Sequence, residues 1–155
     1  MKREEFIKLA KNFLGLPAVK YAGPELGNDE KGFDCPGFVG YILRQSGFPG
    51  EVPRHCNEYF DGFGMLVHKY RPGDLIFFAS KSGGVYPEHM GIVVSKVEYI
   101  HSPGENGKKI EVRRIIKKKI IKVRGQKAKQ IYLRDPIGFK RIANGSGRYR
   151  VPFLD

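Results

Sequence analysis

The spacing of apolar residues changes once along this chain, and that change limits the folds open to it. Apolar residues recur at helical spacing over residues 3–14 and 34–46, and a glycine follows each stretch. Beyond residue 73 the apolar runs are short, which is typical of strands. Helices that come first and strands that come later predict the α+β class, with helices packed on a small antiparallel sheet.

The expected strands cover most of the second half of the chain. They lie at residues 75–79, 89–94, 97–101, 110–116, about 119–124, about 130–134 and 138–142. Residues 17–34 and 48–73 are predicted as loops, with a short helix in the second. A length of 155 residues suits a single domain with one core.

Composition excludes several classes of protein. Hydrophobic residues make up 41% and charged residues 28%, which is the balance of a globular chain rather than a disordered one. No apolar run is long enough to span a membrane. The N-terminus lacks the apolar stretch of a signal peptide, so we expect a cytoplasmic protein unless another system exports it. Two cysteines cannot form a disulfide scaffold, so Cys35 and Cys56 are interpreted as free thiols.

The positive charge is concentrated in one segment. The chain has a formal net charge of +12, and residues 108–134 carry twelve basic residues against Glu111 alone, a net of +11. One interpretation is a solvated hairpin whose lysines keep an edge strand from aggregating. The other is a binding surface for a polyanion, such as an acidic cell-wall polymer, anionic lipid or nucleic acid. The sequence leaves both open.

Cys35 stands at the predicted start of a helix. Asp34 is a suitable N-cap, and Pro36 falls in the first turn, where a missing N–H costs nothing. The positive end of a helix favours a thiolate over a thiol. The backbone N–H of Cys35 is also placed to face the oxyanion of a tetrahedral intermediate.

Two histidines lie on consecutive predicted strands. If the turn centres on Ser95, His89 faces His101, and their side chains share one face of the sheet. Such a pair can act as a base and its orienting partner. We expect Gly91, between them, to let the Cys35 helix approach the sheet. From spacing alone, a structural cysteine and two structural histidines are the commoner case.

The remaining cysteine and histidines indicate less. His55 directly precedes Cys56, and sequence neighbours on an extended chain point to opposite sides, so we interpret Cys56 as a structural thiol. His68 is expected in a surface loop. The chain has no C-x-x-C or H-x-x-x-H spacing, so no metal site is predicted.

At these residues the sequence resembles the NlpC-type cysteine peptidases of bacterial cell walls, in the papain-like superfamily. The resemblance runs from about residue 5 to 142, with Pro36 where the family usually has serine. The matching motifs are Tyr21-Ala22-Gly23, Asp34-Cys35-Pro36-Gly37-Phe38-Val39, Pro72-Gly73-Asp74-Leu75, His89-Met90-Gly91-Ile92 and Ile100-His101-Ser102.

The resemblance implies a Cys–His–His triad in a papain-like fold. Cys35 would be the nucleophile, His89 the general base and then acid, and His101 the orienting residue. Tyr21 and Asp34 would hold substrate, and the Cys35 amide the oxyanion. The implied substrates are peptidoglycan stem peptides, cut between D-glutamate and the diamino acid, without metal or cofactor.

Under the same resemblance, residues 1–155 form one NlpC-type domain, expected to be a monomer. A basic insertion around residues 117–130 is predicted within it, and residues 108–134 are a candidate binding surface for anionic wall polymer or another polyanion.

Two alternatives stay open. One is a papain-like amidase, acyltransferase or toxin with another substrate, although acyltransferase relatives usually place histidine before cysteine. The other is an inactive module that binds polyanions, although such a module has no need of all three triad residues.

Overall fold

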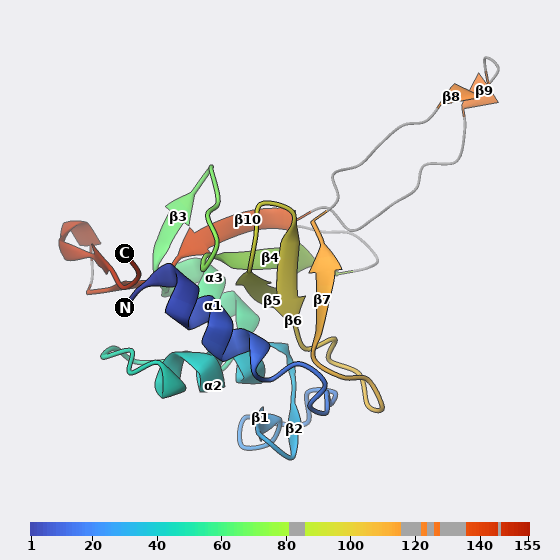
Figure 1. The fold of residues 1–155 in the computed structure, drawn as a ribbon, viewed down its shortest axis with the longest axis horizontal. Coiled ribbons are helices and arrows are strands. Elements are labelled where there is room, and N and C mark those ends of the chain that lie inside the picture. Colours follow the sequence, from blue (N-terminus) through green and yellow to red (C-terminus); the bar gives the residue numbers. More distant parts are fainter. Residues whose placement is uncertain (81–85, 116–121, 124–125, 128–135, 146) are drawn as a thin grey trace.

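The computed structural model describes residues 1–80, 86–115, 122–123, 126–127, 136–145 and 147–155 (Figure 1). The helices are α1 (Arg3–Lys11), α2 (Cys35–Gln45), α3 (Cys56–Gly62) and the 3-10 helix η1 (Gly147–Tyr149). The strands are β1 (Asn28–Asp29), β2 (Gly32–Phe33), β3 (Met65–Val67), β4 (Leu75–Ala79), β5 (Pro87–Val93), β6 (Glu98–His101), β7 (Glu111–Arg114), β8 (Lys122–Val123), β9 (Gln126–Lys127), β10 (Pro136–Arg141), β11 (Ala143–Asn144) and β12 (Val151–Pro152).

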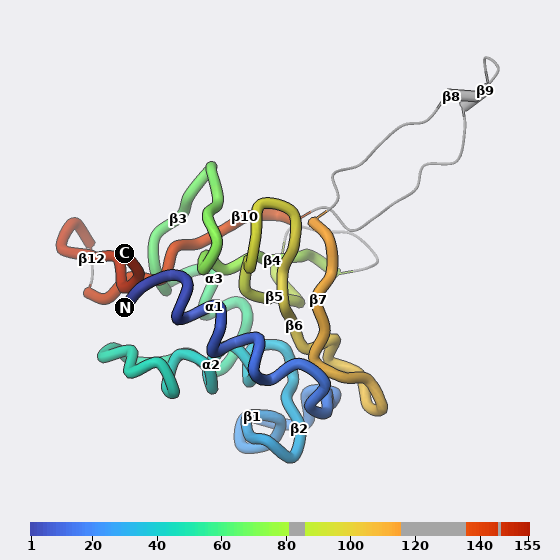
Figure 2. Tube along the Cα trace, in the orientation of Figure 1, coloured from blue at the N-terminus to red at the C-terminus, as the bar shows by residue number. Residues whose placement is uncertain are grey.

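Six strands form one antiparallel sheet in the order β3-β10-β4-β5-β6-β7. Helices α2 and α3 both contact β5, near the centre of the sheet. The main hydrophobic core lies between these helices and the sheet, and α1 joins it through Phe6 and Ala10. Figure 2 shows the two chain ends close together, where the Met1 ammonium donates to the Phe153 carbonyl at 3.3 Å. The α+β prediction is therefore confirmed.

The two elements that carry most of the core also match the sequence. On α2, Phe38, Val39, Ile42 and Leu43 are fully buried. All five residues of β4 are buried, because the helices cover one face of the strand and a smaller apolar cluster covers the other. No described helix has the length and apolar character needed to cross a membrane.

Three local boundaries differ from the sequence prediction. The first helix ends at Lys11 rather than residue 14, because the following amides bond to carbonyls three residues back and tighten the last turn. The loop at 17–34 contains the β1–β2 hairpin. The loop at 48–73 contains the expected short helix, α3, and also β3, whose ladder depends on β10 far along the chain.

Much of the basic segment lies outside the described residues. The expected strands at about 119–124 and 130–134, and the insertion predicted at 117–130, fall largely there. Within that stretch the structure describes β8 and β9, which pair with each other.

The register between β5 and β6 differs from the expected one. Ile92 pairs with Ile100 and Val93 with Tyr99, so the turn centres on Lys96 instead of Ser95. The prediction that His89 directly faces His101 is therefore wrong by two residues. Because the shift is an even number, both histidines still point to one face, as diagonal neighbours.

The role expected for Gly91 also changes. A Cβ on Gly91 would lie 2.7 Å from the Ile100 carbonyl oxygen and 3.0 Å from the His101 Cβ. The missing side chain therefore makes room for β6 and His101, rather than for the helix that carries Cys35.

This crowding predicts that Gly91→Ala destabilises the protein. The added methyl forces β5 and β6 apart, so we expect the free energy of unfolding to fall by about 1–3 kcal/mol in chemical denaturation. Gly62→Ala is the matched control, because a Cβ there meets nothing within 4 Å. Equal stability of the two variants would contradict the packing described here.

Candidate active site

The start of α2 places Cys35 at its first helical position. Asp34 is the N-cap, and its Oδ1 accepts a hydrogen bond from the Gly37 amide at 2.8 Å, which confirms the expected cap. Residue 37 must be glycine here, because a Cβ would lie 2.0 Å from the Gly27 carbonyl oxygen. The close approach of the Gly27 loop therefore sets where the helix begins.

Arg54 neutralises the buried carboxylate of Asp34. Its two terminal nitrogens donate to the two carboxylate oxygens at 3.0 and 2.6 Å, although Asp34 is only 1% exposed. The same guanidinium donates to the carbonyls of Pro24 and Leu26. Arg54 thus joins the loop before α2 to the segment before α3. The sequence did not predict the role of Arg54, because an arginine in a loop 20 residues after Asp34 carries no sign of this contact.

Two polar groups lie close to the sulfur of Cys35. Cys56 Sγ is 3.6 Å away, and the Glu88 carbonyl oxygen of β5, which can only accept a hydrogen bond, is 3.8 Å away. The hydrogen bond from Cys56 does most to lower the pKa of Cys35, and burial opposes it. The charge of the nearby His89 and the Met90 amide lower the pKa further, to about 5.

Cys56 has the opposite tendency. Its contact with Cys35 and its burial both raise its pKa, so it keeps its proton and acts as the donor. Sequence analysis separated Cys56 from the site, whereas the structure places its sulfur against that of Cys35. His55, which directly precedes Cys56, has its Nε2 3.9 Å from the carboxylate of Glu58.

The two histidines are joined by a short hydrogen bond. His89 Nε2 lies 2.6 Å from His101 Nδ1, and both residues are buried. Behind them, His101 Nε2 lies 3.1 Å from the carboxylate of Glu111, which pairs with His101 across β6 and β7. Glu111 stood out in the sequence only as the one acidic residue of the basic segment.

Glu111 decides which ring nitrogens carry protons. A carboxylate only accepts hydrogen bonds, so His101 donates from Nε2 and its Nδ1 is left to accept. His89 then donates from Nε2, and its Nδ1 is the free acceptor. The network therefore leaves an acceptor nitrogen on the His89 imidazole.

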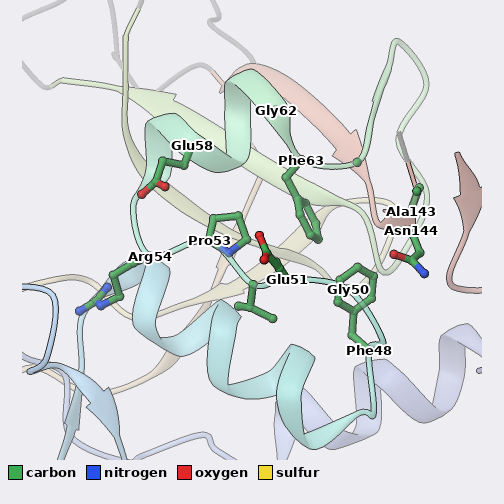
Figure 3. A pocket seen from close by; sticks show the side chains of 13 residues that line it. Phe48, Gly50, Glu51, Pro53, Arg54, Glu58, Gly62, Phe63, Ala143 and Asn144 are labelled. Atoms are coloured by element: carbon green, nitrogen blue, oxygen red, sulfur yellow. The ribbon is translucent and has the colours of Figure 1, made fainter. Parts of the chain in front are cut away.

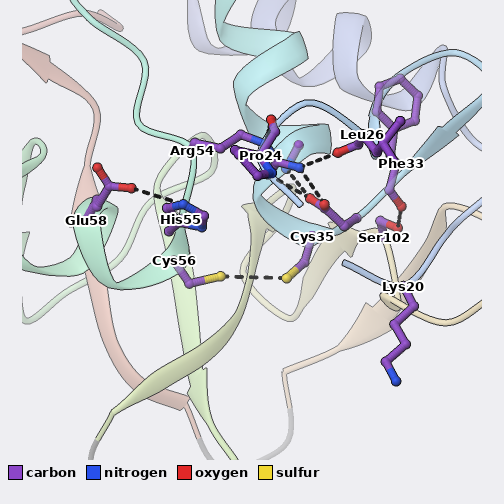
Figure 4. Close-up of polar contacts among 12 residues, drawn as sticks. Lys20, Pro24, Leu26, Phe33, Cys35, Arg54, His55, Cys56, Glu58 and Ser102 are labelled. Carbon is purple, nitrogen blue, oxygen red and sulfur yellow. Dashed lines mark hydrogen bonds and ion pairs between the residues drawn. The ribbon is translucent and has the colours of Figure 1, made fainter. Parts of the chain in front are cut away.

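Tyr21 lies at the edge of this arrangement. The Arg54 guanidinium carbon is 5.4 Å from the centre of its ring, and the His55 ring meets it edge-on at 5.4 Å. The tyrosine is 45% exposed. Ser102, next to His101, donates to the Phe33 carbonyl and ties the end of β6 to the strand just before Cys35 (Figure 4).

The structure thus places Cys35, His89 and His101 in one region, with Asp34 next to Cys35. Tyr21 lies at the exposed edge of this region, against Arg54 and His55. A pocket of about 660 Å³ borders this region (Figure 3). Arg54 lines it, whereas the three triad candidates do not. No group of three or more metal-ligating side chains gathers anywhere in the described part of the chain.

Known proteins share both sequence and fold with this chain. A sequence model described as the NlpC/P60 family matches residues 23–127. The γ-D-glutamyl-L-lysine dipeptidyl-peptidase of Bacillus subtilis strain 168 is 34% identical over 110 residues, which are 70% of this chain and 34% of that protein. The murein DD-endopeptidase MepS/murein LD-carboxypeptidase of Escherichia coli K12 is 33% identical over 82 residues, 52% of this chain and 42% of that protein.

A solved structure agrees with these matches. The crystal structure of an NlpC/P60 family protein from Bacillus cereus ATCC 10987 has a TM-score of 0.66 and 26% sequence identity to this chain. The likeness covers 92% of this chain and 40% of that one. The chain therefore spans less than half the length of each of these three proteins.

The buried ion pair predicts a large effect of Arg54→Met on stability. The substitution leaves the Asp34 carboxylate buried without its cation, so at pH 7 we expect the free energy of unfolding to fall by about 3 kcal/mol in urea denaturation. Arg148→Met is the control, because Arg148 is exposed; its stability should change by less than about 0.5 kcal/mol. A small effect at Arg54 would show that Asp34 does not need this partner.

Proposed function

Because the chain belongs to the NlpC/P60 family, we propose that it is a cysteine peptidase that hydrolyses amide bonds of peptidoglycan stem peptides. The names of the two relatives support this substrate class, since both denote peptidases and one denotes a murein enzyme. The more similar of those two is named for the γ-D-glutamyl-L-lysine bond. We therefore propose cleavage between D-glutamate and the diamino acid.

One observation carries the proposal: the Cys35 sulfur, at a helix start, lies 3.8 Å from the backbone of Glu88, the residue before His89, and His89 is the first of two hydrogen-bonded imidazoles. A cysteine peptidase needs a thiolate, a base that returns a proton to the leaving group, and a partner that holds the base in one tautomer. In this proposal Cys35 supplies the thiolate, His89 the base and His101 the partner that holds the base.

The proposed reaction gives each residue a defined role. The Cys35 thiolate attacks the carbonyl carbon, and the developing oxyanion is held by the Cys35 amide, which at the first position of α2 has no partner within the helix. His89, protonated at Nδ1, gives that proton to the departing amine. His101, held by Glu111, stabilises the His89 imidazolium during this step. Water activated by His89 then releases the acyl group from the sulfur.

Tyr21 and Asp34 have different roles in this proposal. Tyr21 is exposed at the rim, where its ring and hydroxyl are available to a peptide. Asp34 is buried and fully engaged by Gly37 and Arg54, so it acts as a positioning residue for α2 rather than as a substrate contact.

The decisive experiment digests purified stem peptides and follows the fragments by mass spectrometry. The wild-type protein should release a fragment that ends in D-glutamate, and Cys35→Ala should release none, because removal of the nucleophile costs many orders of magnitude in rate. Fragments that end at another residue would correct the bond while keeping the enzyme. Identical profiles for the two proteins would contradict the peptidase and favour a non-catalytic module.

A second experiment tests the ionisation of Cys35. Its pKa is lowered to about 5, so the thiolate fraction, and with it the rate of alkylation by iodoacetamide, should rise as pH increases through about 5. Peptide mapping distinguishes Cys35 from Cys56, whose raised pKa should keep it unlabelled. Half-maximal labelling of Cys35 near the ordinary thiol range would contradict the proposed activation.

Binding of anionic wall polymer by residues 108–134 stays a separate proposal. Its support is the net charge of +11 over those residues.

A further inference from the structure

The proposed mechanism leaves one buried nucleophile unused. Cys56 is the first residue of α3, 21 residues after Cys35, and its side chain points at that of Cys35 (Figure 4). The two sulfurs are 3.6 Å apart, and both thiols are free and buried. A structural thiol needs only an apolar cavity, whereas this one touches the proposed nucleophile.

We propose that Cys35 and Cys56 form a redox modification site, in which a hydroperoxide converts the two thiols into a reversible disulfide that blocks the nucleophile. A disulfide holds its sulfurs about 2 Å apart, so they need to approach by only roughly 1.5 Å. Both side chains already face each other, so modest rotations can bring the sulfurs together. The disulfide itself does not depend on the proposed function, whereas the resulting loss of activity does.

The first step occurs at Cys35. Its thiolate attacks the peroxide oxygen, the O–O bond breaks, and the products are Cys35 sulfenic acid and an alkoxide or hydroxide that takes up a proton. Thiolates react in this way far more readily than thiols. The contacts that ionise Cys35 therefore also direct the oxidant to it rather than to Cys56.

The second step uses the neighbouring thiol. Cys56 attacks the sulfenic sulfur, the S–O bond breaks, and the departing hydroxide leaves as water with the Cys56 proton. Before oxidation, the neighbouring Cys35 is the main reason that the pKa of Cys56 is raised. The sulfenic acid is neutral, so the charge of the thiolate is removed and Cys56 ionises more readily. Overall, two thiols lose two electrons and one peroxide gains them.

The arrangement also protects the nucleophile. A sulfenic acid without a nearby thiol is open to a second peroxide, which gives sulfinic acid that dithiols do not reduce. A disulfide, in contrast, is returned to two thiols by an external dithiol. The Cys56 thiol is 3.6 Å from the Cys35 sulfur. It can therefore react with the sulfenic acid before a second peroxide does.

The test treats three proteins with hydrogen peroxide and then with dithiothreitol. Wild-type protein should lose two hydrogens in intact mass, yield a Cys35–Cys56 cross-linked peptide, and recover its iodoacetamide labelling at Cys35 after reduction. Cys56→Ser keeps a donor of similar size but cannot form the disulfide, so it should accumulate sulfinic acid. Its labelling of Cys35 after reduction should be at least about ten-fold lower than that of wild type, each relative to its untreated sample. In Cys35→Ser, Cys56 should remain a thiol.

Each result supports or overturns the proposal. Sulfinic acid at Cys35 with a free Cys56 in the wild-type protein would overturn it, and so would equal recovery of the wild-type and Cys56→Ser proteins. Cys56→Ala serves as the second variant if Cys56→Ser does not fold. A cross-link in a protein that cuts no stem peptide would sustain the redox site and refute only the peptidase. If peroxide left the cleavage of stem peptides unchanged, the redox site would be refuted and the peptidase proposal would stand.

Discussion

The carboxylate of Asp34 joins the parts of the chain on which the site depends. It caps α2 through Gly37, and Arg54 binds both of its oxygens while holding two carbonyls of the preceding loop. A buried carboxylate is costly unless it is paired, so these contacts stabilise one another. They also neutralise a negative charge next to Cys35. Without Arg54, the negative charge of the N-cap Asp34 would disfavour the Cys35 thiolate, which the positive end of the helix favours.

The sheet aligns the two imidazoles and the carboxylate of the site. His89 and His101 come from adjacent strands, and Glu111 from the next one, so a single run of antiparallel pairing places all three on one face. A glycine at position 91 lets the strands carry two imidazoles in contact. The partly exposed carboxylate of Glu111 fixes the tautomer of His101, and His101 in turn fixes the tautomer of His89.

A second sulfur beside the first has two consequences. As a donor, Cys56 lowers the pKa of Cys35 more than burial raises it. A protein that places a thiol against a thiolate also places the two atoms of a disulfide within reach. Activation of the sulfur and its sensitivity to oxidants therefore arise from one contact, in the same way that helix capping and charge neutralisation both arise from Asp34.

Sequence patterns determined the features that depend on neighbouring residues. The cap at Asp34, the apolar face of α2 and the buried strand β4 all follow from local spacing, and the resemblance of short motifs to a known family selected Cys35, His89 and His101 as candidates. The tertiary structure alone decided that Arg54 pairs with Asp34 and that Cys56 touches Cys35. It also shifted the β5–β6 register by two residues. These contacts join segments through loops whose paths depend on packing, and periodicity carries no information on where a loop leads.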